Sequence, residues 1–335
     1  MDANLERICR TYVSNRDAIH KSSLMSYSMM ADAGALMYTS AKKPADTATV
    51  KMCGKIIKQH VGGLSNMRGH MRLPVMVKMS LHDDPERYFN YLLSVYQKLT
   101  ESKVFRSEYL VLAAMAIADN CDATQVDEAV QKTYALHRTM REDHPVITES
   151  ADLTMAAVLA TAPIDASSCL DEAERCYALL KDEHFKLAKD TVQAVSHVLA
   201  LSPLPAEEKC QRFLRLRQMM KDAGHRIGNG RELAILAALV DIDVPDEELI
   251  SQIGEVDSWL KTQRGFGAMG TGAQLRRMIA ATLVLEGNDR AAVGTSATLG
   301  ASLATTVAEQ IIISIITTII ITSAVVSSSH SSSAS

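Results

Sequence analysis

The pattern with the clearest chemical precedent is a glycine-rich stretch late in the chain. Residues 265–270 read Gly-Phe-Gly-Ala-Met-Gly, which satisfies G-x-G-x-x-G, the loop that lets a backbone approach a pyrophosphate. Glu286 follows Gly265 by 21 positions. This spacing is close to the roughly 20 residues after which such sites place the acidic residue that binds the ribose. The fingerprint also needs a preceding strand, whereas the residues before it continue a helical pattern. The stretch therefore predicts a wide turn between helices, and no cofactor is expected.

The ten histidines show no spacing typical of a metal site. His144, His184 and His225 recur in one kind of inter-helix turn, so they either form a ladder along an edge or occupy helix C-termini, where a positive charge is favourable. The second interpretation is favoured. His197 is predicted to be a core histidine with its hydrogen bonds satisfied. No metal ligand is predicted.

Other catalytic patterns are missing or explained by helix geometry. No G-x-S-x-G elbow occurs, and Gly54-Lys55 does not follow the loop that a phosphate-binding lysine requires. Acidic pairs stand at predicted helix starts, where carboxylates stabilise the helix dipole: Asp83 and Asp84, Asp241 and Asp243, Glu247 and Glu248. No catalytic residue is predicted, which favours a protein that is not an enzyme.

The composition predicts an all-α fold. Hydrophobic residues make up 47% of the chain but aromatic residues only 4%, and there are only 8 prolines, so small and unbranched side chains must form the core. No C-x-x-C pair and no apolar signal peptide are present, which indicates that the protein is located in the cytosol. The cysteines are therefore expected to be reduced thiols that act as small core residues. The cysteines are Cys9, Cys53, Cys121, Cys169, Cys176 and Cys210.

Two series of apolar residues repeat with a period of about 40 residues. The first ends each long amphipathic stretch and comprises Leu99, Met140, Leu180, Met220 and Leu260. The second begins each Ala- and Met-rich stretch and comprises Leu112, Met155, Val195, Ile235 and Met278. A buried small-residue helix, a turn and a longer amphipathic helix therefore form one unit, and such units stack side by side.

The sequence thus predicts an α-solenoid-like array of helical hairpins with an apolar C-terminal tail. Residues 1–66 are expected to form an N-terminal helical cap, 67–292 the hairpin repeats, and 293–335 the tail. Helix starts are predicted with Asp84 as N-cap before Pro85, with Ser168 as N-cap, and with Pro245 before acidic residues.

Several segments carry a resemblance to a known family. The segments from Ala35 to Leu99, "HVLALSPLPAEEKC" and "QRGFGAMGTGAQLRRMIAATLV" resemble a bacterial family called domain of unknown function 4003. The resemblance covers most of residues 30–290 and implies the helical array, followed by a charge-poor tail. It assigns no functional residue to this chain.

The charge balance argues against a nucleic-acid partner, since the net charge is −4. Residues 1–72 nevertheless hold eleven Lys and Arg against five Asp and Glu. Lys51, Lys55 and Lys58 are expected to share one helix face. This face either complements the acidic remainder of the chain or binds an anionic partner, and the first alternative is favoured.

The tail from Gln310 to Val326 contains eight isoleucines and no charged residue. As a helix, these 17 residues would span about 26 Å, slightly less than a hydrocarbon core of about 30 Å. Extending the helix back to Ala301 would span the core but would include Glu309. The tail therefore either contacts a membrane, or caps the array or self-associates.

Three functions follow from these observations. The favoured one is a non-catalytic cytoplasmic scaffold or protein-interaction module, with a protein partner or self-association. The second is a membrane-associated protein anchored by Gln310–Val326. The third is an enzyme with a site in the groove of the array, which would require a polar cluster with perturbed pKa values.

Overall fold

The structure, a computed structural model, describes residues 1–22, 28–101, 107–163, 165–181, 187–267, 270–288, 307–308 and 310–317. Within these residues the secondary structure is helical and no strand occurs. The predicted all-α class is confirmed.

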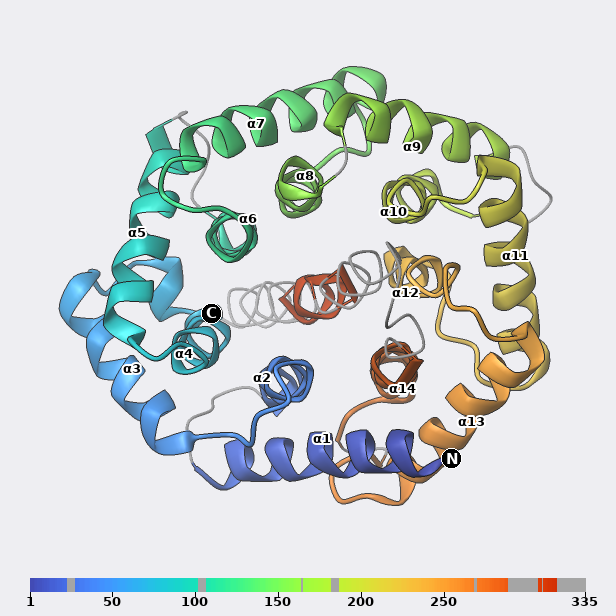
Figure 1. Cartoon of the computed structure of the whole chain (residues 1–335), viewed down its shortest axis with the longest axis horizontal. Helices are drawn as coiled ribbons and strands as arrows, with labels where there is room; N and C mark the ends of the chain where they lie inside the picture. Colours follow the sequence, from blue (N-terminus) through green and yellow to red (C-terminus); the bar gives the residue numbers. More distant parts are fainter. Residues whose placement is uncertain are drawn as a thin grey trace, which may run out of the picture.

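The helices alternate along the chain between an outer and an inner layer of a ring (Figure 1). The outer layer consists of α1 (Ala3–Lys21), α3 (Thr47–His60), α5 (Pro85–Glu101), α7 (Val126–Asp143), α9 (Ala166–Lys181), α11 (Ala206–Asp222) and α13 (Asp246–Thr262). These helices are amphipathic: on α5, Phe89, Leu92 and Val95 are buried on the inner stripe, and Tyr91 lies at its border.

The inner layer consists of α2 (Ser28–Ser40), α4 (Arg72–Ser80), α6 (Glu108–Asn120), α8 (Asp152–Thr161), α10 (Lys189–Leu199), α12 (Ala234–Ala237) and α14 (Ala273–Asn288). The short 3-10 helix η1 (Asn66–Arg68) precedes α4, and η2 (Arg231–Leu233) leads into α12. Inner helices are buried on nearly all sides, as Leu110–Ala118 of α6 illustrates. The expected burial of the Ala- and Met-rich helices is confirmed. Their small side chains allow helices on both sides to pack closely against them.

The ring closes where its first and last helices meet. Helix α14 packs against α1, and the N-terminal amino group forms an ion pair with Glu255 of α13. Helix α1 thus lies beside α14, and the first and last helices are neighbours in one ring (Figure 1). Closure leaves the last hairpin without the exposed end that a linear stack would have.

The predicted helix starts are correct at two of three places. Asp84 precedes α5 and accepts a hydrogen bond from the Arg87 amide at 2.9 Å, and Pro245 precedes α13 with acidic residues in its first turn. Ser168 is not an N-cap, because α9 begins at Ala166 and the Asp165 carboxylate accepts from the Ser168 amide at 2.9 Å. Hydrogen bonds from Ser167 and Ser168 lower the pKa of Asp165 to about 2.

Helical residues of the C-terminal tail lie in the middle of the ring (Figure 1). These residues, 307–308 and 310–317, are called the lumen helix below, and the space that the inner helices enclose is called the lumen. Ile312 and Ile316 are 0% exposed, and the Thr317 hydroxyl contacts the Met71 sulfur at 3.7 Å. In the parts of the chain that are described, no helix is long and apolar enough to cross a membrane.

Candidate functional site

Four buried polar side chains and the partly exposed Arg231 lie on the lumen helix and on the elements around it. Asp152 comes from the start of α8, Gln193 and His197 from α10, Arg231 from η2 and Gln310 from the lumen helix itself. We call these five residues the lumen cluster. Most of the other wall residues at this contact are apolar, among them Met155, Val158, Ala194 and Ala234, so the polarity of the cluster requires a specific explanation.

An ion pair forms the centre of the lumen cluster. The Arg231 guanidinium donates to Asp152 Oδ1, and Asp152 Oδ2 accepts from the Glu149 amide at 2.8 Å. The carboxylate therefore also satisfies a backbone donor at the start of α8. Burial alone would lower the pKa of Arg231, but the adjacent Asp152 carboxylate raises it above its ordinary value. Arg231 is therefore charged near neutral pH.

His197 lies beside this pair and is only 2% exposed. Burial lowers its pKa from 6.5 to about 4, against the opposing effect of Asp152, so the imidazole is neutral at physiological pH. Its Nδ1 atom has no hydrogen-bond partner among the described atoms. The predicted burial of His197 is confirmed. The prediction that its hydrogen bonds are satisfied would require a protein partner for Nδ1, and none occurs among the described residues.

The side-chain amides of Gln193 and Gln310 also each have one oxygen atom without a hydrogen-bond partner in the described part of the chain. Gln193 donates to the Thr148 hydroxyl at 2.8 Å while its own Oε1 accepts nothing within the described residues, and the same holds for Oε1 of Gln310. Unpartnered polar atoms thus occur on both the lumen wall and the lumen helix. A buried acceptor left unpaired costs free energy, which makes this contact less stable than an apolar one of equal area.

A cavity of about 50 Å³ separates the lumen helix from this wall. Asp152, His197 and Arg231 line one side, and Gln310 and Ser314 line the other. A water molecule needs roughly 10–15 Å³ of such volume, so the cavity has room for about three to five water-sized groups. A larger ligand would reach the polar wall only if the lumen helix moved.

His197 makes the stability of the protein depend on pH. Its folded-state pKa of about 4 lies below 6.5, so between these values only the unfolded chain takes up the proton. We expect the free energy of unfolding to fall by about 3 kcal/mol as the pH drops from 6.5 to 4. Urea titrations at half-unit pH steps measure this, and His197→Gln should lose most of the slope; an equal slope in the variant would contradict the prediction.

The glycine-rich stretch forms the loop between α13 and α14. We call residues 263–267 and 270–272 the closing loop; Ala268 and Met269 of the predicted motif lie outside the described residues. Gly265 adopts a φ of +87°, and its carbonyl accepts from the Thr271 amide at 2.8 Å. A helix and not a strand precedes the loop, so the context that a dinucleotide fingerprint needs does not occur here.

The closing loop binds a buried arginine of α1. Arg16 donates to the carbonyl oxygens of Arg264 and Gly265 at 3.2 and 3.3 Å, and its guanidinium carbon lies 4.3 Å from the Phe266 ring centroid. The same side chain pairs with Asp32 of α2 at 2.5 Å. The glycines let the backbone carbonyls approach this guanidinium, which gives the motif a role in closing the ring.

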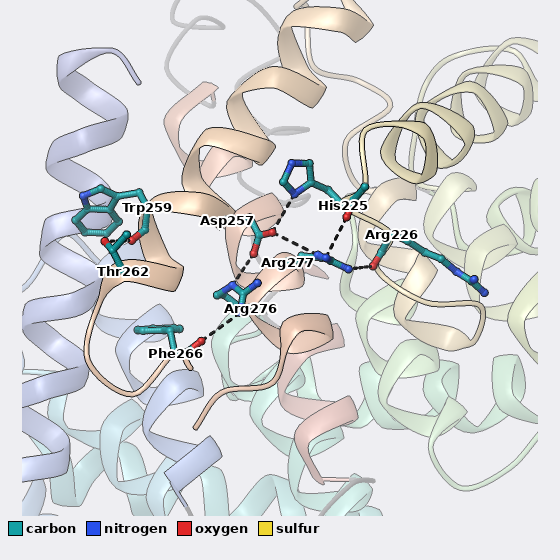
Figure 2. A network of polar contacts seen from close by, with 9 residues as sticks. His225, Arg226, Asp257, Trp259, Thr262, Phe266, Arg276 and Arg277 are labelled. Carbon is teal, nitrogen blue, oxygen red and sulfur yellow. Dashed lines mark hydrogen bonds and ion pairs between the residues drawn. The ribbon is translucent and has the colours of Figure 1, made fainter. Parts of the chain in front are cut away.

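A second buried network holds the other side of the loop (Figure 2). Asp257 of α13 accepts hydrogen bonds from Arg276, His225 and Arg277, at 2.6, 2.9 and 3.3 Å. Burial alone would raise the pKa of Asp257, but the bonds from Arg276 and His225 lower it below its ordinary value. Arg276 also donates to the Phe266 carbonyl at 3.2 Å, which joins this network to the closing loop.

Two of the glycines in the motif should respond differently to substitution. A Cβ at Gly270 would lie 1.8 Å from the Gly265 carbonyl oxygen, whereas a Cβ at Gly267 meets nothing within 4 Å. We expect Gly270→Ala to lower the free energy of unfolding by more than about 1 kcal/mol and Gly267→Ala to change it by less than about 0.5 kcal/mol. Chemical unfolding measures both. Equal effects would contradict this interpretation, and NAD binding by the parent chain would contradict the expected lack of a cofactor.

The recurring histidines do not form a ladder in the described part of the chain. His144 bonds Glu174 at 2.9 Å and His225 bonds Asp257, so each joins the end of one outer helix to the next outer helix. His184 lies outside the described residues. No group of three or more potential metal ligands occurs among the residues placed in the structure. The favoured position at helix C-termini is correct for His144, the C-cap of α7.

Other predicted features lie where expected. All six cysteines are free, and all but Cys121 are buried. Lys51, Lys55 and Lys58 are exposed along α3. Asp83 and Asp84 directly precede α5, and Glu247 and Glu248 lie in the first turn of α13, which agrees with their interpretation as helix-start residues. Asp241 differs: it lies five residues before α13 and accepts a hydrogen bond from the Ser202 hydroxyl.

The lumen cluster is the feature that the sequence did not reveal. Asp152 and Arg231 are separated by 79 residues, and each alone resembles an ordinary residue at a helix start. The only available signal was polarity in Ala-rich inner helices, where Gln193 and His197 interrupt apolar residues. These two polar residues indicate a site only when the faces of the inner helices that point to the lumen are known, and those faces depend on the ring as a whole.

Comparison with known proteins adds one match. A family model described as protein of unknown function (DUF4003) matches residues 17–316, a range that extends from α1 into the lumen helix. No curated protein and no solved structure matches the chain.

Proposed function

The chain belongs to the family described as protein of unknown function (DUF4003), and we propose that it is a non-catalytic binding module whose lumen binds an apolar helix. In the single chain, its own lumen helix occupies that position. One observation carries the proposal: an isoleucine-rich helix from the end of the chain is buried against inner helices that precede it in sequence. The proposal includes a cytoplasmic location.

The hairpins are proposed to be repeats of one unit. Support comes from Leu99, Met140, Leu180, Met220 and Leu260, which occupy equivalent places near the ends of α5, α7, α9, α11 and α13 and are at most 2% exposed. Units of this kind bury a continuous core only by stacking. Such a ring offers an enclosed surface for a helical ligand.

The lumen contact combines apolar burial with polar defects. Ile311, Ile312, Ile313 and Ile316 are buried, and burying each such side chain contributes about 1.5–3 kcal/mol. The unpaired Oε1 of Gln310 and Nδ1 of His197 oppose that gain. A partner helix that is apolar at the place of Gln310 would lack that defect and would compete with the chain's own helix. The His197 defect belongs to the wall and is the same for both helices.

The partner proposed is therefore a protein segment, either of another protein or of a second copy of this chain. A nucleic-acid partner is not proposed, since the net charge is −4. The alternative is a membrane, reached through Gln310–Val326 after release from the lumen. The run of 17 uncharged residues supports this alternative, and their marginal length weighs against it.

A second candidate function is an enzyme whose site is covered by the lumen helix. The observation that favours it is the neutral, buried His197 beside the Asp152–Arg231 pair, since perturbed groups in a cavity are typical of active sites. Turnover that appears on release of the lumen helix and disappears in His197→Gln would support this function. The small cavity makes the binding module the better supported of the two.

A chain that can be cut after folding tests the proposal. We would insert a specific protease site between Ala292 and Val293, fold the intact chain, cleave it, and add a labelled peptide copying residues 307–320 with two added lysines for solubility. Binding of the peptide with displacement of the tail fragment is expected. A peptide with aspartate in place of Ile312 and Ile316 is the control and should not bind.

The other outcomes discriminate among the alternatives. If the tail fragment never exchanges, the lumen helix is a permanent part of the core and the binding-module proposal fails. Vesicles of phosphatidylglycerol and phosphatidylethanolamine form a separate arm of the experiment. Sedimentation of the intact chain with vesicles, lost in a chain ending at Ala292, would favour the membrane alternative.

A further inference from the structure

A second cavity, of about 680 Å³, lies beside α1, where the turn between α2 and α3 approaches it. It is separate from the lumen cluster and shares none of its residues. Ten of its thirteen lining residues have polar or charged side chains.

Four cationic side chains line this cavity. Arg7 and Arg10 come from α1, three residues apart and therefore on one face of the helix. Lys42 and Lys43 come from the turn after α2. The four are exposed, and the carboxylates that line the cavity with them belong to Glu6 and Glu286.

The two cationic elements are held in place by a buried amide. Asn15 of α1 donates to the Thr39 hydroxyl at 3.3 Å and to the Lys43 carbonyl at 3.2 Å, and its oxygen accepts from the Ala45 amide at 2.8 Å. Asn15 is 2% exposed. These bonds fix the lysine turn against α1, so the cations do not need to be ordered by a ligand.

Lys42 has a backbone conformation that a lysine rarely adopts. Its φ is +56°, and among the described residues it is the only residue other than glycine with a positive φ. This turn ends α2 through bonds from the Lys42 amide to Thr39 and from the Lys43 amide to Tyr38, and glycine or asparagine is the usual residue at such a position. A lysine with a positive φ costs stability that a glycine would not cost, and strained residues of this kind cluster at binding sites.

We propose that this cavity binds a phosphorylated sugar or polyol. Arg7, Arg10 and Lys42 are suited to a phosphate group, because charge-assisted hydrogen bonds to phosphate are among the stronger polar contacts. The hydroxyl groups of Thr11 and Ser14 and the Glu286 carboxylate line the same cavity, and they are suited to the hydroxyl groups of a sugar. The excess of positive charge over residues 1–72 attracts such a ligand from solution.

Calorimetric titration of the full chain tests the site with glucose 6-phosphate, fructose 1,6-bisphosphate, glucose and inorganic phosphate. Both sugar phosphates should bind and weaken as salt is raised, the bisphosphate more tightly, while inorganic phosphate binds more weakly and glucose gives no signal. The double variant Arg7→Gln with Lys42→Asn should lose affinity for the bisphosphate about tenfold or more. Asparagine is chosen because it tolerates a positive φ, so thermal unfolding should show a folded variant.

The double variant Lys51→Gln with Lys55→Gln is the matched control, since it removes the same two positive charges from exposed positions of α3 outside the cavity and should leave affinity within about twofold. An equal loss in this control would assign binding to diffuse surface charge and overturn the proposal. Inorganic phosphate binding as tightly as the sugar phosphates would also overturn it, as would the lack of any signal at millimolar ligand. None of these results depends on the lumen helix, so they test this site independently of the proposed binding module.

Discussion

Replacing Ile312 by alanine should lower the free energy of unfolding by about 2–5 kcal/mol, the range for removing a large aliphatic side chain from a packed core. Ile312 is 0% exposed and belongs to the lumen helix. Its side chain is surrounded by the inner layer of the ring, which is held by the outer layer and cannot easily collapse into the space that the substitution leaves. The upper half of the range is therefore expected.

Ile315→Ala is the matched control, because it removes the same atoms from the same helix at a partly exposed position. Its effect should be clearly smaller, about 1 kcal/mol. Urea unfolding followed by circular dichroism measures both changes, and an unchanged urea dependence would show that the same surface is exposed on unfolding. Equal, small effects would mean that the lumen helix does not pack in the ring in solution.

This prediction also limits how the lumen could bind a partner. If Ile312 and its buried neighbours each contribute this strongly, an empty lumen exposes apolar surface that the ring does not tolerate. Exchange therefore requires that an incoming helix replaces those contacts as the tail leaves. The unpaired polar atom at Gln310 lowers the stability of the chain's own contact, so a helix that is apolar at this place would have an advantage there.

Helix positions followed closely from the sequence, because local patterns decide them. The five apolar residues from Leu99 to Leu260 all lie near the ends of outer helices, and the Ala-rich stretches all became inner helices. The wrong N-cap at Ser168 differs by three residues from the real one at Asp165. A carboxylate accepts from backbone amides more strongly than a hydroxyl does, which favours Asp165 over Ser168 at this helix start.

Ring closure did not follow from the sequence, because it depends on the small rotation between successive hairpins. The hydrophobic pattern of a hairpin is the same in an open stack and in a closed ring. Contacts that exist only through closure therefore had no local signal: Arg16 bonds the Gly265 carbonyl across 249 positions. The lumen cluster is hidden for the same reason, since α8, α10 and η2 meet only around a shared centre.

The contact between Arg16 and Asp32 is where a single substitution should affect closure most. The two side chains are 5% and 1% exposed and lie 2.5 Å apart, and Asp32 also accepts from Tyr12 and Thr271 at 2.9 Å. Arg16→Gln removes the guanidinium and leaves a buried carboxylate without its cation. We expect a loss of about 3–5 kcal/mol in the free energy of unfolding.

The matched control is Arg10→Gln, on the same helix, which breaks the exposed pair with Glu6 and should cost less than about 1 kcal/mol. Adding Asp32→Asn to Arg16→Gln should recover part of the loss, because the uncompensated charge is then gone. Hydrogen exchange distinguishes closure from general stability: amides of the closing loop and α1 should exchange faster in Arg16→Gln than those of α6 and α7, on the far side of the ring. Uniform acceleration across all four segments would show that the ring unfolds as one unit and that this ion pair has no special role in closing it.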